Sequence, residues 1–448
     1  MAIIGIILFI VALLATVAIH ELGHLVPAKL FGTKVSKYFI GFGPTLWSRT
    51  WKGTEFGIKA ILLGGFVAIA HMLPPAPVGT RTLRKDGTLT LAEEARRASA
   101  AEIDEHEEHQ AFWRLPARKK IVVMFGGPAT NLVIAFLCAV VVVSGLGIPT
   151  TTTTVAEVVK CMPAAEAAKE ADTASREASS RQTASACEYG VSPAFLAGFQ
   201  PGDRITTWNG EEVSSWEQVQ GAIKGAGTQQ VSVTVVRNGA ERRLSVQARE
   251  TPRPRLDSSG QIVTDQDGEP RLEMKPYVGI GPAIERQAQP LGRAVAFTGE
   301  LAWGTAKIVL TLPAQLWNTV SDLFTGEPRD ANSVVGVVGV AQMAGSITSV
   351  EADQYTLSDR VGDFVMLIGS LNMSLFVFNM LPLLPLDGGH ILGALIEGAR
   401  RHWARRRGKP DPGAFDTAKM LPLSYAVIVF FIAMTLLLVV ADLINPVV

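Results

Sequence analysis

The chain has 448 residues, of which 48% are hydrophobic, and its 41 lysines and arginines balance 41 aspartates and glutamates. A formal net charge of zero excludes a bulk electrostatic attraction to nucleic acid or to an acidic partner. The hydrophobic residues gather in four long blocks, each close to the roughly 20 residues that cross a bilayer.

The first apolar block, predicted to span the membrane over residues 1–24, ends in the sequence HELGH at residues 20–24. A cleaved signal peptide is the alternative, but the block lacks a basic start and a small-residue cleavage site. We therefore expect a permanent helix that carries a polar pattern at one end.

Residues 25–118 follow as a predicted cytoplasmic region. Short β-like runs separated by Gly and Pro at about 35–70 indicate a β-loop lying against the membrane. Further on, His106 and His109 stand among acidic residues. They could bind a second metal, but an exposed acidic helix face is the better explanation.

The second span is predicted at 119–148, and Cys138 within it is expected to pack as a small apolar residue. A low-complexity extracytoplasmic segment at 149–187 has few residues that could build a core. Cys161 and Cys187 flank its Ala- and Ser-rich part, and an oxidising exterior would favour a disulfide, with two free thiols as the alternative.

Residues 188–282 show turn signals between short apolar runs, which predicts a compact α+β domain with a hairpin that turns at Asn238-Gly239. The region 283–362 is predicted to be membrane-proximal. Its residues 291–312 favour an amphipathic helix on the membrane surface over a spanning one. Its residues 334–348 are apolar and glycine-rich.

The third span is predicted at 363–387, followed by a basic cytoplasmic loop at 388–420 and a fourth span at 421–442. Asn372 in the third span is expected to form hydrogen bonds inside the helix bundle, because it would be costly facing lipid. Lysines and arginines concentrate before the second span and between the third and fourth. By the positive-inside rule both termini and residues 149–362 lie outside, and the loops 25–120 and 388–420 lie in the cytoplasm.

The HELGH pattern predicts a metal site. On a helix His20 and His24 share one face, and Glu21 points about 100° away, where it could act as a base. Catalytic zinc commonly has three protein ligands. Asp387 is the first charge after the third apolar run and falls at a depth similar to that of His20, so it is the expected third ligand. A pair of histidines at the headgroup level is the alternative, but an intramembrane histidine–glutamate cluster is expensive unless it has a function.

HELGH and FNMLPLLPLDGGH resemble the site-2 protease family of intramembrane zinc metalloproteases, most closely its RseP-like branch and the actinobacterial members. Three further stretches are similar to parts of that branch: FGIKAILLGGFVAI to its membrane β-loop, GGPATNL to the start of its second span, and SPAFLAGFQPGDRITTWNG to a PDZ domain.

This resemblance implies Zn²⁺ bound by His20, His24 and Asp387, with Glu21 as the catalytic acid and base. It implies a substrate-handling role for Asn379, although the prolines after it, at 382 and 385, depart from the usual spacing. No family member gives His390 a ligand role. Gly64, Gly65 and Pro382 lie where a substrate would have to bend, so we expect them to contact it.

The predicted fold is therefore a polytopic α-helical membrane protein with four transmembrane helices, a membrane-associated β-loop and an extracytoplasmic α+β PDZ domain. The expected activity is zinc-dependent cleavage of transmembrane segments in the bacterial cytoplasmic membrane. The substrates would be single-pass proteins such as anti-sigma factors, cut first by a site-1 protease, or remnant signal peptides. Membrane lipid is an expected partner and nucleic acid is not. A non-hydrolytic PDZ-containing sensor or scaffold with a structural metal is the alternative, and a transporter fits poorly because no inverted repeat is visible.

Overall fold

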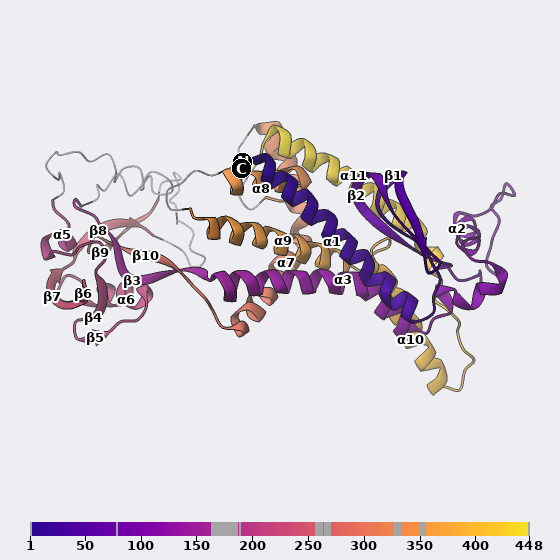
Figure 1. The fold of residues 1–448 in the computed structure, drawn as a ribbon, viewed down its shortest axis with the longest axis horizontal. Coiled ribbons are helices and arrows are strands. Elements are labelled where there is room, and N and C mark those ends of the chain that lie inside the picture. Colours follow the sequence, from indigo (N-terminus) through magenta and orange to yellow (C-terminus); the bar gives the residue numbers. More distant parts are fainter. Residues whose placement is uncertain are drawn as a thin grey trace. The chain divides into compact units, whose positions relative to one another are not determined.

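The computed structural model of the chain describes residues 2–446 except 78, 163–186, 188–189, 256–262, 264–269, 327–328, 330–332 and 350–354. The described residues form two compact units. Met1–Leu146 and Gln289–Val448 make up the first unit, which holds the long helices, and Gly147–Ala288 make up the second (Figure 1).

Within the described part of the first unit, four helical runs are long and apolar enough to cross a membrane. This agrees with the polytopic membrane protein that the sequence predicts. The runs are α1 (Ala2–Leu30), α3 (Ala117–Ala139) continued by the π-helical η3 (Val140–Leu146), α9 (Leu357–Asn379), and η4 (Thr417–Met420) continued by α11 (Leu421–Ile444). Helix α1 extends past the predicted end at residue 24, so HELGH lies inside the helix, with a further turn beyond it.

The prediction of one helix over 363–387 needs correction. Helix α9 ends at Asn379, and a separate helix, α10 (Asp387–Arg406), begins at Asp387. Pro382 and Pro385 lie between them, and proline lacks the N–H that would continue a helix and disfavours the helical conformation in the residue before it. The predicted basic loop 388–420 is accordingly helical over most of its length.

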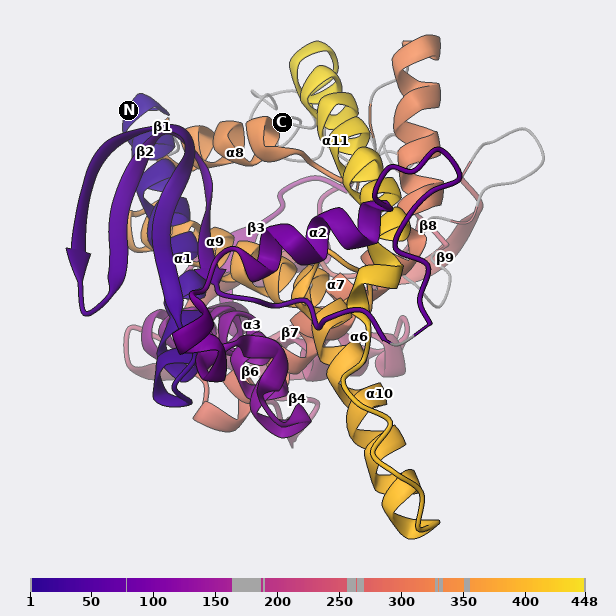
Figure 2. The ribbon, with the colours of Figure 1, turned by 90° about the vertical axis from the view of Figure 1, so that its right-hand side faces the viewer.

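The strands β1 (Val35–Trp51) and β2 (Thr54–Ile69) form a long twisted hairpin, which Figure 2 shows beside α1. It turns at Lys52 and Gly53, whose φ angles of 48° and 74° suit a tight hairpin turn. Tyr38 lies opposite Val67 on one side and Phe56 on the other, so the first part of β1 is an inner strand. Among the described residues, the strand partners of 65–69 all lie in 35–40, which leaves residues 65–69 as an outer edge.

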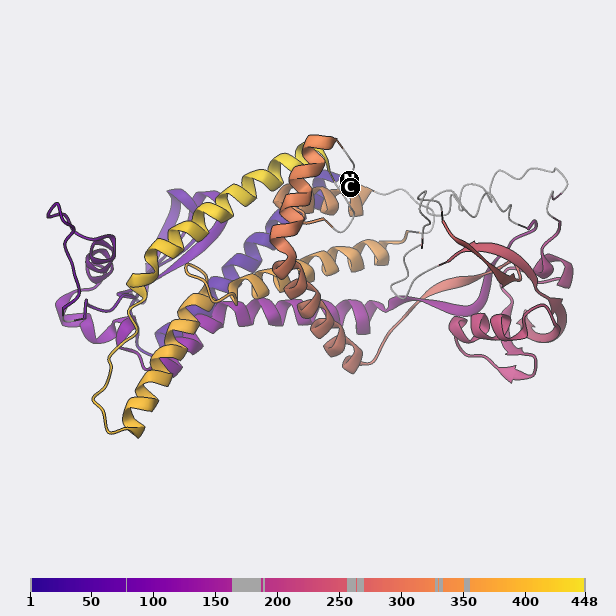
Figure 3. The same ribbon diagram turned by 180° about the vertical axis from the view of Figure 1, so that it is seen from behind.

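Among the described residues, three short helices connect the hairpin to α3: α2 (Leu91–Ala100), η1 (Glu105–Gln110) and η2 (Phe112–Arg114). Two further helices precede α9. They are α7 (Leu291–Thr325) and α8 (Val337–Ser349), so the predicted helix at 291–312 continues past Pro313. Figure 3 shows α7, in salmon, crossing α9 and meeting α11, in yellow.

Two predictions about polar and small side chains inside the bundle are confirmed. Asn372 is fully buried and donates to Thr16 Oγ1 at 3.2 Å and to the Ile368 carbonyl at 2.9 Å. Cys138 packs against Gly369, where an added Cβ would lie 2.9 Å from the Cys138 Cβ. Both contacts join neighbouring helices without using the predicted metal ligands.

The main sheet of the second unit has the strand order β10-β3-β4-β6-β7 with antiparallel neighbours. Strand β5 pairs with β4, and β8 and β9 form a separate two-stranded sheet. The hairpin turn at Asn238-Gly239 is confirmed between β6 and β7. The strands and helices of this unit are β3 (Ile148–Val158), α5 (Pro193–Ala197), β4 (Arg204–Trp208), β5 (Glu211–Glu212), α6 (Trp216–Ala226), β6 (Gln230–Arg237), β7 (Ala240–Gln247), β8 (Arg249–Pro254), β9 (Leu272–Tyr277) and β10 (Ile280–Gln287).

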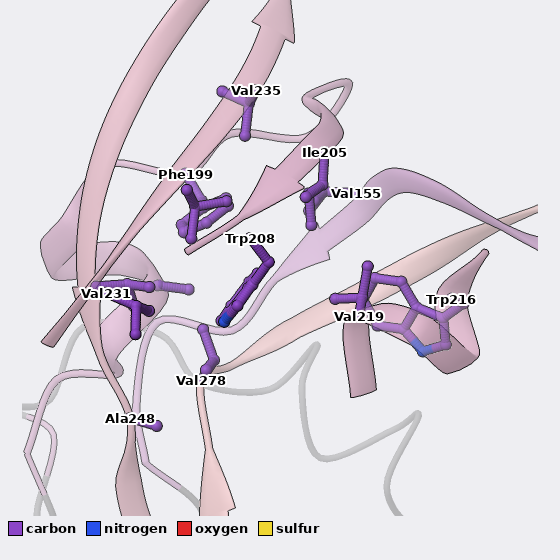
Figure 4. Close-up of a cluster of buried hydrophobic side chains, with 13 residues drawn as sticks. Val155, Phe199, Ile205, Trp208, Trp216, Val219, Val231, Val235, Ala248 and Val278 are labelled. Carbon is purple, nitrogen blue, oxygen red and sulfur yellow. The ribbon is translucent and has the colours of Figure 1, made fainter. Parts of the chain in front are cut away.

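A single apolar cluster fills this unit, and Figure 4 shows Trp208 among Phe199, Val231 and Val278. Val155 from β3 is fully buried in the same cluster. The assignment of 149–187 to a low-complexity segment therefore needs correction at its start, because the threonine run forms β3. β-branched residues favour strands, which explains why a low-complexity composition is compatible with a core strand. The rest of the low-complexity prediction, residues 163–186, lies outside the described residues.

The two cysteines of the second unit, Cys161 and Cys187, are joined as a disulfide with a Cα–Cα distance of 5.2 Å. Cys161 also pairs with Val191 as an isolated bridge, just before α5. The disulfide thus anchors the chain at the entrance to α5.

Candidate active site

Three of the predicted site residues converge in the first unit. His20 and His24 lie one turn apart on α1, and Asp387 is the first residue of α10. The two histidine Nε2 atoms are 3.3 Å apart, and Asp387 Oδ2 lies 3.5 Å from His20 Nε2 and 3.4 Å from His24 Nε2. Among the described residues these three side chains form a group whose ligand atoms could share one metal ion.

The spacing of these atoms fits zinc. Tetrahedral Zn²⁺ with bonds of about 2.0–2.2 Å to nitrogen and oxygen holds its ligand atoms about 3.3–3.6 Å apart. The three measured distances fall between 3.3 and 3.5 Å. Three protein ligands leave the fourth tetrahedral position open, as catalytic zinc sites require.

The backbone of α3 fixes the orientation of His24. Its Nδ1 lies 2.8 Å from the carbonyl of Val123, which can only accept a hydrogen bond. The proton of the neutral ring is therefore on Nδ1, and the Nε2 lone pair points toward His20 and Asp387. Carbonyl partners of this kind orient histidine ligands in metal sites generally.

The side chain of Asn131 on α3 orients the His20 ring in the same way. The Asn131 side chain is fully buried, its Nδ2 lies 3.1 Å from His20 Nδ1, and its Oδ1 has no hydrogen-bond partner among the described residues. The oxygen and nitrogen of a side-chain amide exchange places on a half turn. In that orientation Oδ1 accepts from His20 Nδ1–H, and the His20 Nε2 lone pair is directed at the metal position.

Glycines allow α3 to approach α1 this closely. A Cβ on Gly126 would lie 1.9 Å from the Gly23 carbonyl oxygen, and a Cβ on Gly127 would lie 2.2 Å from His24 Nε2. Small residues at such crossings are typical of packed membrane helices. The histidines therefore lie directly against the backbone of α3.

The turn before α10 positions Asp387. A Cβ on Gly388 would lie 2.2 Å from the Leu381 carbonyl oxygen, and a Cβ on Gly389 would lie 2.6 Å from the Leu384 nitrogen. The two glycines after Asp387 thus let the first turn of α10 pack on the backbone of residues 380–384. Asn379 and Pro382 belong to the end of α9 and to this turn, and the ligand group does not include them.

Glu21 lies beside the three converging atoms, on the side of the hairpin. Its carboxylate accepts a hydrogen bond from the Val67 backbone amide and interacts electrostatically with His20, His24 and Asp387. Gly65 is close, since a Cβ there would lie 3.4 Å from Glu21 Cγ. Its neighbour Gly64 has a φ of 107°, which favours glycine.

Tyr38 fixes the hairpin on α1 at the same level. Its hydroxyl donates to the Ala18 carbonyl at 2.8 Å. Burial, and second the Glu21 carboxylate, raise the pKa of Tyr38 to about 12, so the phenol stays neutral and keeps this hydrogen bond. The outer strand 65–69 is thereby held next to Glu21.

The acidic stretch around His106 and His109 has ion pairs of its own. Lys34 pairs with Glu107, and Arg114 pairs with Glu108 at 2.8 Å. Among the described residues His106 and His109 join no group of three metal-binding side chains. These contacts agree with an acidic helical surface paired with basic residues.

Comparison with known proteins decides the family. The family model described as Peptidase family M50, the site-2 protease family, matches residues 8–410. This chain belongs to that family.

Relatives in this family are similar along nearly the whole chain. Zinc metalloprotease Rip1 of Mycobacterium bovis is 30% identical over 449 residues, which cover 99% of this chain and 98% of that protein. Zinc metalloprotease Rip1 of Mycolicibacterium smegmatis is 30% identical over 451 residues, with the same two coverages. Metalloprotease MmpA of Caulobacter vibrioides is 26% identical over 399 residues, 87% of this chain and 86% of that protein.

This M50 chain is therefore a zinc metalloprotease and a polytopic membrane protein, as the sequence predicts. A non-hydrolytic sensor or scaffold is set aside. The likeness of GGPATNL to the family does not by itself predict a role for Asn131. A signal was present, because a buried asparagine in an apolar helix needs a polar partner.

Proposed function

We propose that this M50 protein is an intramembrane endopeptidase that cuts the transmembrane segments of single-pass proteins. Anti-sigma-factor-like proteins are the first candidate substrates, and remnant signal peptides are the second. The observation that carries the proposal is the convergence of two histidine nitrogens and one carboxylate oxygen, at zinc spacing, inside the unit that holds the four apolar helices.

We assign His20, His24 and Asp387 as the zinc ligands. Zinc, when bound, polarises a carbonyl and lowers the pKa of a coordinated water to roughly 7. Zn²⁺, the Asp387 carboxylate and one coordinated hydroxide would together carry no net charge, and a neutral cluster costs less to hold in a low dielectric than its separate ions. Val123 and Asn131 keep the two Nε2 lone pairs aimed at the ion.

Glu21 is the proposed general base and acid. It lies outside the ligand trio yet interacts with all three of its members. Its carboxylate can take the proton of the attacking water and then give it to the leaving amine nitrogen. The Val67 amide holds that carboxylate at the face of the site where the hairpin lies.

The outer strand at residues 65–69 is the proposed docking edge for the substrate. A transmembrane helix hides its carbonyls in its own hydrogen bonds, so it must unwind before water can attack. An unpaired strand edge offers the backbone partners that the unwound segment needs. Gly64 and Gly65 leave the start of this edge without side chains, and Asn379 and Pro382 are proposed to contact the substrate from the end of α9 and the turn after it.

The hairpin is proposed to lie in the membrane. Its side chains Leu46, Trp47 and Trp51 are 68%, 57% and 62% exposed, which is costly in water and favourable in lipid. Positive residues near the helix ends support an orientation with both termini outside and the zinc site toward the cytoplasmic side of the bacterial cytoplasmic membrane.

The second unit is proposed to be an extracytoplasmic PDZ domain. Its α+β composition, the capped helix α5 and the following Gln200-Pro201-Gly202-Asp203 turn support this assignment. A cavity of about 560 Å³ lies between α6 and residues 273–280, a site suited to an extended peptide end. Such a domain would exclude substrates that still carry bulky outer domains and admit those trimmed by a site-1 protease.

Co-expression with candidate single-pass anti-sigma factors tests the function. Trimmed substrates should be cut within their transmembrane segments, and the Glu21→Gln variant should leave them intact. Intact transmembrane segments in every candidate, trimmed or not, would argue against this substrate class. Cleavage by the Glu21→Gln variant would show that Glu21 is not the base.

A further inference from the structure

A second polar cluster joins α3 to α10. Lys120, near the start of α3, places its Nζ 2.7 Å from Glu397 Oε2 on α10, and the two side chains are 9% and 1% exposed. The Phe415 amide donates to the same oxygen at 3.2 Å, and Arg401 Nη1 lies 3.2 Å from the other, Oε1. Glu397 therefore has three positive or N–H groups around one buried carboxylate.

Both helices in this cluster carry parts of the metal site. Lys120 precedes Val123, the acceptor of His24, by one turn of α3, and Asn131 follows on the same helix. Glu397 lies ten residues after Asp387 on α10, about 15 Å along the axis at 1.5 Å per residue. The ion pair thus ties the helix that orients the histidines to the helix that supplies the carboxylate.

Apolar packing alone does not fix how α10 lies along α3. Between the ion pair and the site, Ile391 packs with Val123 and Met124. Such contacts are non-directional, so a small slide along the axis costs little. A buried ion pair repays its desolvation only in one geometry, and an apolar pair of similar volume is often as stable. The buried charges of Lys120 and Glu397 are therefore better explained by a role in fixing the position of α10 on α3 than by a contribution to the stability of the fold.

We propose that Glu397, paired with Lys120, is a positioning residue of the zinc site. It fixes the axial position of α10 on α3 and thereby the distance of Asp387 Oδ2 from the two histidine nitrogens. This inference rests on the proposed role of Asp387 as a zinc ligand. Glu397 itself touches neither metal nor substrate.

The test compares two buried ion pairs. The double variant Lys120→Met/Glu397→Leu replaces the pair with apolar side chains. The control Arg329→Met/Asp442→Leu does the same to a pair 3.0 Å apart, 0% and 1% exposed, that joins α11 to the segment before α8. Zinc affinity is measured by competition with a chelator, the ligand geometry by the visible spectrum of the Co²⁺-substituted protein, and folding by thermal unfolding.

The Lys120/Glu397 variant should unfold near the wild-type temperature, bind zinc about tenfold to a hundredfold more weakly and give an altered Co²⁺ spectrum. The control should keep the wild-type zinc affinity and spectrum. Wild-type affinity and spectrum in the Lys120/Glu397 variant would overturn the inference, as would an equal loss in the control.

Glu397→Asp covers the case in which the double variant does not fold. It keeps the charge and shortens the side chain by one methylene, and it should give a smaller loss of zinc affinity in a folded protein. Unchanged affinity in Glu397→Asp would also overturn the inference. Asp387→Ala separates the two proposals. If that variant keeps its zinc, Asp387 is not a ligand. If that variant loses its zinc while the Glu397 variants bind zinc normally, Asp387 remains a ligand and only the positioning role of Glu397 is wrong.

Discussion

At the scale of single residues, the proposed zinc site depends on the groups that orient its ligands as well as on the ligands. The Val123 carbonyl and the Asn131 amide each occupy the Nδ1 of one histidine. An imidazole that lost its partner could turn or change tautomer, and its Nε2 would no longer point at the ion.

The first prediction is that Asn131→Ala weakens zinc binding about tenfold to a hundredfold, since losing an orienting partner typically costs that much. Chelator competition on the purified variant measures it. Asn372→Ala is the matched control, because Asn372 is also a fully buried asparagine in an apolar helix but bonds Thr16. It should lower thermal stability and keep zinc affinity, and equal zinc affinities in both variants would remove the role given to Asn131.

His71 predicts a pH dependence of local stability. Its ring is buried against Trp113, its φ is 50°, and its Nδ1 lacks a partner among the described residues. Burial lowers the pKa of His71 below its usual 6.5; of the charges nearby, Glu108 opposes that shift and Arg114 adds to it. The folded state therefore binds fewer protons than the unfolded state, and stability falls as the pH drops through about 6.5.

Hydrogen exchange of residues 70–73 between pH 7.5 and 5.5, corrected for the intrinsic exchange rate, measures this effect. Protection should decrease toward pH 5.5 in the wild type. His71→Asn, which tolerates the positive φ and does not titrate, should show less dependence on pH. The same pH dependence in both proteins would assign the effect to another group.

His20, His24 and Asp387 could be proposed as a group from the sequence because the evidence for them is local. Two histidines four residues apart share a helix face, and one charge ends a long apolar run. The residues that orient these ligands could not be predicted, because Asn131 and His20 are 111 positions apart and their contact depends on how α1 crosses α3. The one indication of this contact in the sequence is that a side-chain amide buried in an apolar helix needs a polar partner.

At the scale of elements, the site exists because α3 and the hairpin approach α1 closely and because α10 begins beside it. Gly23, Gly126 and Gly127 leave no room for a Cβ between α1 and α3. The turn at residues 380–386 brings Asp387 to the start of a new helix. The apolar run up to Asp387 predicts a single span, but Pro382 and Pro385 interrupt it, so Asp387 begins a helix instead of ending one.

Replacing Gly127 tests the approach of α3 to α1. In Gly127→Ala the new Cβ would lie 2.2 Å from His24 Nε2, so the helix or the ring must move, and zinc content and activity should both be lost. Gly304→Ala is the control, since a Cβ there would meet no atom of the described residues within 4 Å beyond its chain neighbours and the nearby backbone of its own helix. Alanine in the interior of α7 should raise the free energy of unfolding by about 0.5–1 kcal/mol and leave zinc bound. A Gly127→Ala protein with one zinc and normal activity would contradict the described packing.

At the scale of the whole molecule, the chain divides the work between a unit of long helices and a β-rich unit. The boundary of the second unit was predicted too late, at residue 188, because a threonine run has the composition of a linker. Its pairing with β10 and β4 identifies it as a core strand. Composition alone does not reveal a strand whose partner, β10, lies more than a hundred residues away.

The proposed filter role of the second unit gives a prediction for the whole chain. Deleting 147–288, with the helices rejoined by a flexible linker of matching span, should keep zinc bound and should allow uncut, full-length substrates to be cleaved. Immunoblots of tagged substrates in co-expressing cells measure it. A deletion variant that cuts trimmed substrate yet still refuses the full-length form would place the filter in the helical unit.

The central claim is that His20, His24 and Asp387 hold the zinc and that Glu21 acts only in turnover. Metal analysis of purified Glu21→Gln, beside Asp387→Ala, tests it most directly. Glu21→Gln should hold about one zinc per chain and cleave nothing, and Asp387→Ala should lose its zinc. Loss of the metal from Glu21→Gln, or an Asp387→Ala protein that keeps its zinc and cuts at the normal rate, would contradict it.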